Sequence, residues 1–207
     1  MVLVTEKIRK NGEDPIFLLV QELKKLPGIG GKTATRLAYA LIKKNKSEID
    51  ALINAIINMK EDVTLCSVCY NLSNMNPCAF CSDSNRNNDT ICVVEEPSHI
   101  KVIEQGGNFK GRYHVLHGTI SPLDGVGPKD LKVQDLAARV EKNGIREVIV
   151  ATNPTASGDV TAVYISRLLK PHGIKITRIG LGVPVGGDLD YIDPMTLNRA
   201  IENRKEV

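Results

Sequence analysis

Four cysteines stand within sixteen residues of this chain and form two pairs. Cys66 and Cys69 make the first pair, Cys78 and Cys81 make the second, and eight residues separate the pairs. Two Cys-x-x-Cys pairs at this separation are typical of tetrahedral zinc, and four thiolates leave no ligand position open for water. The pattern therefore predicts one structural Zn²⁺ per chain. A redox-active dithiol is the alternative, but that motif is expected once and beside a βαβ unit, not in duplicate ahead of one.

A glycine-rich segment that begins at Leu26 is the second candidate site. It reads L-P-G-I-G-G-K-T-A and ends like a nucleotide-binding P-loop, but that motif requires glycine in place of Leu26 and a preceding strand. A helix-hairpin-helix fits better, because Gly28 and Gly30 permit a tight turn and the next helix can direct free N–H groups at a phosphate. Lys32 and Arg36 lie four residues apart, so they share one face of that helix. We expect these four residues to bind the DNA backbone without reading bases.

The charge of the chain is concentrated around this hairpin. The net charge is +3, with 11 basic and 8 acidic residues up to Leu65 and 16 of each from Cys66 onward. Between Leu23 and Ser47 there is no acidic residue, which favours a phosphate-binding surface over a solvated helical face. Seven basic residues lie in that interval: Lys24, Lys25, Lys32, Arg36, Lys43, Lys44 and Lys46.

Apolar residues at helical spacing place the hairpin in a small helical unit. Three such runs cover about residues 16–23, 34–42 and 49–57. Pro27 and Gly28 lie between the first two runs and separate them. Ser47 and Asp50 have the spacing of a capping box, so we expect them to begin the third helix.

The pattern changes after a polar connector at residues 82–89. Short apolar runs then alternate with helical patterns, which predicts βαβ units on a mostly parallel sheet and an α/β fold overall. Cys92 falls within the first of these runs and is expected to be a small buried hydrophobe. We assign no ligand role to the four histidines: His99, His114, His117 and His172. The expected strands cover residues 91–94, 113–116, 148–151 and 174–179, and the expected helices cover 98–105, 131–143 and 160–169.

Composition narrows the functional class. Hydrophobic residues make up 42% of the 207 residues and aromatic residues only 4%, so base stacking is not expected to be the main binding mode. No apolar run reaches the length of a membrane span, and Glu6, Lys7, Arg9 and Lys10 stand where a signal peptide requires an apolar stretch. We therefore expect a cytoplasmic protein with no membrane contact.

Taken together, the hairpin, the cysteine pairs and the later motifs resemble the RecR family along nearly the whole chain. Two departures stand out: Gly31 replaces a frequent proline, which would loosen the hairpin slightly, and Glu96 replaces a small residue. The resembling segments, in order, are the hairpin L-P-G-I-G, the cysteine spacing, Ile91–Glu95, Leu123–Pro128, Ala151–Thr155 and Gly182–Gly187.

The resemblance implies a Toprim domain without its catalytic acids. Catalytic Toprim domains hold magnesium with a glutamate after one strand and an Asp-x-Asp pair after another; Glu95 fits the first position, but Asn153 and Thr155 occupy the second. Magnesium sites are built from carboxylates, so this degenerate site should not support phosphoryl transfer. Asp159 is the nearest acid downstream, and we expect it to be structural at the start of a helix.

The resemblance also divides the chain into regions. It implies a helix-hairpin-helix unit at 1–62, a zinc finger at 63–82, a Toprim domain at 89–184 and a helical tail at 185–207 that joins subunits. Asp188, Asp190 and Asp193 lie in a segment that is sometimes likened to a Walker B motif, but without a Walker A partner we expect a loop before the terminal helix.

The function implied is that of a non-enzymatic recombination mediator in DNA repair. Such a protein would form a homo-oligomer, a tetrameric ring, on DNA and act with RecO and RecF to load recombinase onto single-stranded gaps. It would be bacterial and associated with the nucleoid when active. Two alternatives remain: a magnesium-dependent Toprim nuclease or primase that uses Glu95, and a scaffold that binds proteins only.

Overall fold

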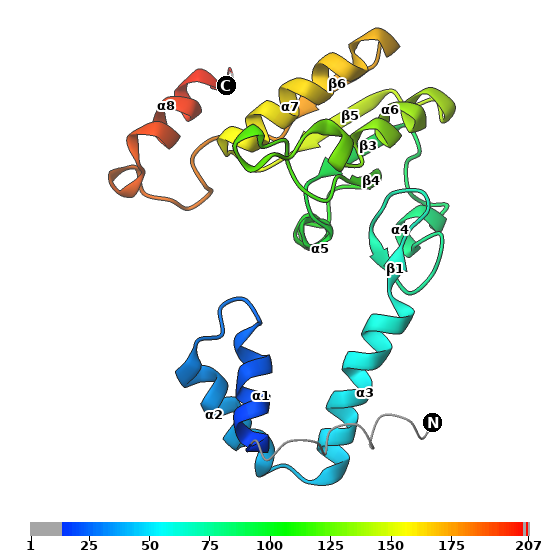
Figure 1. The fold of residues 1–207 in the computed structure, drawn as a ribbon. Coiled ribbons are helices and arrows are strands. Elements are labelled where there is room, and N and C mark those ends of the chain that lie inside the picture. The colour runs from blue at the N-terminus through cyan, green and yellow to red at the C-terminus, as the bar shows by residue number, and fades with distance from the viewer. Residues whose placement is uncertain (1–13, 205, 207) are drawn as a thin grey trace. The chain divides into compact units, whose positions relative to one another are not determined.

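The computed structural model describes residues 14–204 and residue 206, and the chain divides into two compact units, residues 1–61 and residues 62–207 (Figure 1). Each unit is described by itself. The first thirteen residues of the predicted hairpin unit lie outside the described residues.

The first unit is helical, as its apolar spacing predicts. Helix α1 (Pro15–Lys24) begins after Asp14, whose side chain accepts a hydrogen bond from the N–H of Ile16. Helix α2 (Gly31–Ile42) packs against α1 and buries Ala34 and Ala38 completely, since alanine lets two helices approach closely. Helix α3 (Lys46–Asp62) completes the unit and ends at the division between the units.

The start of α3 corrects one expectation. Its capping box is formed by Asn45 and Glu48: the N–H of Glu48 donates to Asn45 Oδ1 at 3.0 Å, and the N–H of Asn45 donates to Glu48 Oε2 at 3.1 Å. Ser47 and Asp50 have the right spacing but lie within the helix. The prediction failed because asparagine caps as well as serine does, and it stands two residues earlier.

The second unit is built on a parallel four-stranded sheet with strand order β4–β3–β5–β6. The strands are β3 (Thr90–Val94), β4 (Arg112–Val115), β5 (Glu147–Ala151) and β6 (Lys175–Arg178). Each matches a predicted strand within two residues at either end. The helices between them are α5 (Pro97–Gln105), α6 (Val133–Lys142) and α7 (Ala156–Leu169).

Both faces of this sheet are buried, which explains why its strands are almost continuously apolar. Ile91 and Val93 pack with α6 and α7 on one face, whereas Cys92 and Val94 pack on the opposite face with α5 (Figure 1). The buried Cys92 is the small hydrophobe that was expected, and burial raises the pKa of its thiol to about 12.

The cysteine segment docks against β4, an edge strand of the sheet. It contains a two-stranded ribbon, β1 (Thr64–Leu65) and β2 (Leu72–Ser73), and the short helix α4 (Ala79–Ser82). The N–H of Val115 donates to the carbonyl of Cys69 at 2.8 Å, and the Phe80 ring meets the Tyr113 ring edge-on at 5.5 Å. The docked segment thus covers part of an otherwise open strand edge.

The chain ends in helix α8 (Pro194–Glu202), which follows the expected loop. Asp188 and Asp193 act as caps in this region: Asp188 accepts from the N–H of Asp190 at 3.2 Å, and Asp193 accepts from the N–H of Thr196 at 3.0 Å. Within residues 14–204, none of the helices has the length and apolar character required to cross a membrane.

Candidate functional site

The hairpin between α1 and α2 presents an open helix terminus. Gly28 adopts a left-handed conformation with φ of 79°, which favours glycine. Gly30 begins α2 without a side-chain cap, and added Cβ atoms at Gly28, Gly30 or Gly31 would meet no atom within 4 Å. The first N–H groups of α2 are therefore accessible, and the helix dipole makes this end attractive to an anion.

Lys32 and Arg36 both lie on α2 and are exposed. Within residues 14–204 neither forms an ion pair with a carboxylate. By contrast, the outer lysines of the basic stretch are partly neutralised, because Lys25 pairs with Glu22 at 2.7 Å and Lys44 pairs with Glu48 at 2.6 Å. Lys32 and Arg36 are thus among the basic residues of this stretch whose charge no carboxylate neutralises within residues 14–204.

The four predicted metal ligands come together in the second unit. The Sγ atoms of Cys66, Cys69, Cys78 and Cys81 all lie within 4.8 Å of one another. Cys69 Sγ and Cys78 Sγ are 3.5 Å apart, close to the roughly 3.8 Å that tetrahedral bonds of about 2.3 Å to one zinc ion would give. Three of the four cysteines are buried, so the cluster can hold a metal in a site closed to water.

The local backbone supports this cluster. The N–H of Cys78 donates to Cys66 Sγ at 3.3 Å. Hydrogen bonds from Cys69 and Cys81 lower the pKa of the Cys78 thiol, and the same bond to Cys78 raises the pKa of Cys69. A bound dication would hold all four cysteines as thiolates.

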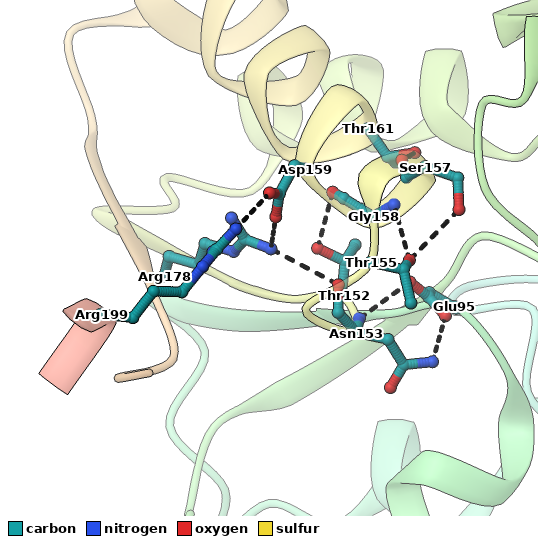
Figure 2. A network of polar contacts seen from close by, with 10 residues as sticks. All are labelled: Glu95, Thr152, Asn153, Thr155, Ser157, Gly158, Asp159, Thr161, Arg178 and Arg199. Atoms are coloured by element: carbon teal, nitrogen blue, oxygen red, sulfur yellow. Dashed lines mark hydrogen bonds and ion pairs between the residues drawn. The ribbon is translucent and has the colours of Figure 1, made fainter. Parts of the chain in front are cut away.

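The residues predicted to form a degenerate Toprim site lie where β3 and β5 end side by side. Glu95 follows β3, and its carboxylate accepts two hydrogen bonds from Asn153, which follows β5 (Figure 2). Glu95 is only 6% exposed. Its Oε1 accepts from the backbone N–H of Asn153 and its Oε2 from the side-chain amide, so an amide and not a carboxylate faces Glu95 here. Glu96, by contrast, is exposed, so its additional charge faces solvent.

Thr155 has a structural role at the start of α7. Its Oγ1 accepts from the N–H of Gly158 at 3.1 Å, which makes it the N-cap. Gly158 is packed so closely that an added Cβ would stand 2.1 Å from the Asn153 carbonyl oxygen. The cap also explains why α7 begins at Ala156, four residues before the apolar pattern suggests.

Asp159 is held by two arginines. Its Oδ1 lies 2.6 Å from Arg178 Nη2 and its Oδ2 lies 3.1 Å from Arg199 Nη2 (Figure 2). These contacts lower the pKa of Asp159, the bond from Arg178 contributing most. The expected structural role agrees with this geometry, although ion pairing as well as the helix dipole accounts for it. Asp159 thereby ties β6 and α8 to α7.

Sequence reasoning missed the buried arginines of the second unit. Arg86 lies in the polar connector, yet it forms an ion pair with Glu104 at 2.5 Å and stacks over the rings of Phe80 and Tyr113. Arg112 and Arg139 line a cavity together with Cys81. No local pattern identifies such residues, because their partners are distant in the sequence.

Comparisons with known proteins assign the chain. Residues 17–60 match the family described as RecR, helix-hairpin-helix, residues 89–180 match Toprim domain, and residues 182–205 match RecR, C-terminal. The chain is 50% identical over 194 residues to Recombination protein RecR of Heliobacterium modesticaldum and 51% identical over 194 residues to that of Anaeromyxobacter dehalogenans. Each alignment covers 94% of this chain and 98% of the relative. This chain therefore belongs to the RecR family of recombination proteins.

Proposed function

We propose that this chain is a non-enzymatic recombination mediator that binds DNA through the start of α2. The observation that carries the proposal is the uncapped terminus at Gly30 beside two exposed cations, Lys32 and Arg36, which have no carboxylate partner within residues 14–204. Backbone N–H groups and guanidinium or ammonium groups contact phosphates and leave base edges unread, so binding should be independent of sequence.

A salt series tests this directly. Binding of a labelled oligonucleotide is followed by fluorescence anisotropy for wild type and for the Lys32→Glu, Arg36→Glu double variant. We expect the variant to lose most of its affinity for DNA. The slope of log affinity against log salt concentration should become shallower by roughly 0.7–0.9 for each of the two lost phosphate contacts. Lys60→Glu, Lys101→Glu makes the same change in charge at two exposed lysines outside the basic stretch and is the matched control. Equal loss in both variants would mean that net charge, not the hairpin, governs binding.

Absence of catalysis is part of the same proposal. Glu95 is bonded on both oxygens by Asn153, and Thr155 caps a helix, so neither replaced position supplies a second carboxylate for magnesium. In the binding assay, magnesium should leave the DNA intact. Magnesium-dependent cleavage or synthesis that disappears in Glu95→Gln would favour the nuclease or primase instead.

We infer that zinc occupies the cysteine cluster, one ion per chain. The sulfur spacing and burial support a structural tetrathiolate site, in which the ion holds the finger together and activates no water. Elemental analysis should find about one zinc per chain, and Cys66→Ser, Cys69→Ser should abolish it. Cys92→Ala is the control, because Cys92 is buried outside the cluster.

Partners follow from family membership. We propose that the chain acts with RecO and RecF on single-stranded gaps and that copies of it join into a tetrameric ring. The exposed apolar residues of α3 support self-association; Ile53, Ile56 and Met59 are 47%, 55% and 60% exposed. Light scattering after size exclusion should give four chain masses, and a mass of one chain would contradict the ring. Loading of recombinase onto gaps coated with binding protein should require all three mediators.

A further inference from the structure

Two guanidinium groups lie between the cysteine segment and the sheet without an acidic partner. Arg112 opens β4 and is 8% exposed, and Arg139 lies on α6 and is partly buried. Within residues 14–204 no carboxylate forms an ion pair with either of them. By contrast, Arg86, which stacks on Phe80 and Tyr113 at the same interface, pairs with Glu104.

The groups that these two arginines contact are neutral. Arg112 Nη1 donates to the carbonyl of Phe80, the residue before Cys81, and Arg112 Nε donates to Asn88 Oδ1 at 2.8 Å. Arg139 Nη1 donates to the Tyr113 carbonyl at 2.5 Å. Hydrogen bonds of this kind orient a guanidinium group but leave its full positive charge uncompensated, and an uncompensated buried charge is costly.

The cysteine cluster adjoins the cavity that both arginines line. Cys81, Arg112 and Arg139 line one cavity of about 340 Å³, and its remaining walls are neutral: Val68, Asn88, Asn143 and Ile145. Burial lowers the pKa of Arg139, whereas negative charge on Cys81, Cys69 and Cys66 raises it. Cys81 is the cluster member that lines this cavity together with both guanidinium groups.

We infer that Arg112 and Arg139 are positioning residues that neutralise the metal–thiolate centre and so join the zinc finger to the sheet. The inference rests on the proposed zinc occupancy. Four thiolates around one dication carry two net negative charges, and the two guanidinium groups supply two positive ones. Groups around a first ligand shell tune metal retention in this way without touching the ion.

The two arginines belong to the sheet domain and the cysteines to the zinc finger. The attraction between the guanidinium groups and the metal–thiolate centre therefore holds the finger against the sheet. The contact is reinforced by neutral bonds at the same strand edge: Val115 N–H to the Cys69 carbonyl at 2.8 Å, and His117 Nε2 with the Tyr70 carbonyl at 2.7 Å. Loss of the ion would protonate thiolates and leave both arginines unbalanced. Metal removal should therefore loosen β4 as well as the finger.

The test measures how fast the holoprotein releases zinc to a chromogenic chelator in excess. Arg112→Gln and Arg139→Gln remove one charge each and keep a hydrogen-bond donor. We expect release about 10-fold faster in each single variant, in line with losses at other outer-shell partners. Arg146→Gln is the matched control, because Arg146 is exposed in the same domain.

A conservative variant separates charge from packing. Arg139→Lys keeps the positive charge but lacks the planar guanidinium group. If the charge stabilises the centre, this variant should release zinc at nearly the wild-type rate. If the shape of the side chain matters instead, the rate should be close to that of Arg139→Gln. Equal release from wild type and both glutamine variants would overturn the inference while leaving zinc occupancy intact. If the purified wild-type protein contained no zinc, the proposed metal site itself would be contradicted. Faster release from both glutamine variants, with Arg146→Gln unchanged, supports the inference.

Discussion

Asn153 donates two hydrogen bonds to Glu95, from its backbone N–H to Oε1 at 2.8 Å and from its side-chain amide to Oε2 at 2.6 Å. Replacing the amide in Asn153→Asp keeps the shape but sets a second carboxylate against the buried Glu95 carboxylate. We expect the free energy of unfolding to fall by about 2 kcal/mol, because one donor is lost and like charges repel.

Magnesium should then rescue the variant. Two carboxylates form the type of oxygen site that magnesium prefers, so magnesium should raise the thermal midpoint of Asn153→Asp and leave wild type unchanged. The control is Glu95→Gln, Asn153→Asp, in which one carboxylate remains. A wild-type midpoint that rises equally with magnesium would contradict the idea that an amide in place of a carboxylate prevents magnesium binding.

Gly158→Ala should be strongly destabilising. Its Cβ would lie 2.1 Å from the Asn153 carbonyl oxygen, a backbone atom that cannot move without disturbing the Glu95 contact. We expect a loss of about 3 kcal/mol or more in urea unfolding. Gly180→Ala is the control, because an added Cβ there meets no atom within 4 Å. Equal stability of the two variants would show that α7 can shift freely.

Asp159→Asn should release the C-terminal helix. The carboxylate contacts Arg178 and Arg199 together, and its side chain is one-third exposed, so the global stability should change little. Hydrogen exchange in Pro194–Glu202 should accelerate, because Arg199 loses its partner. Since the pKa of Asp159 is lowered, the same contact should persist at neutral pH and be lost only in acid. Glu141→Gln, an exposed change on α6, should leave exchange in α8 unaltered.

His114 makes stability depend on pH. Burial lowers its pKa to about 4, and its Nε2 lies 2.7 Å from the Lys132 carbonyl, so it is neutral in the folded chain. The imidazole of the unfolded chain takes up a proton near pH 6.5, whereas that of the folded chain does not. The contribution of neutral His114 to the free energy of unfolding is therefore fully present above that pH and is lost as the pH falls toward 4. Between about pH 7.5 and about pH 5.5 the loss should be about 1.3 kcal/mol. Comparison with His114→Gln isolates this contribution, and identical pH profiles would disprove it.

Much of the sheet could be predicted, because its strands are buried on both faces and are nearly continuous runs of apolar residues. Val93 and Cys92 lie on opposite faces, so both had to be apolar. Helix starts were harder to predict where capping residues, not apolar spacing, set them. Asn45 displaced Ser47 as a cap, and Thr155 begins α7 before any apolar repeat is visible.

The candidate sites were predictable to different degrees, because some are defined by residues close in the sequence and others by residues far apart. The cysteine cluster is encoded by short spacings, so its four members could be named from the sequence. The Glu95–Asn153 contact joins residues 58 positions apart and follows only from β3 and β5 being neighbours. Arg112 and Arg139 have no sequence pattern at all, because what defines them is a buried position beside a cluster formed elsewhere in the chain.

The docking of the cysteine segment on β4 has a consequence for the amount of folded protein in a cell. An uncovered parallel strand edge invites pairing with other chains, and here the cover is a segment of about twenty residues that the proposed zinc ion would hold together. When zinc is scarce, newly made chains would expose that edge before they could dock the finger. We therefore expect metal starvation to lower the abundance of this protein through aggregation and proteolysis, before any change in its affinity for DNA.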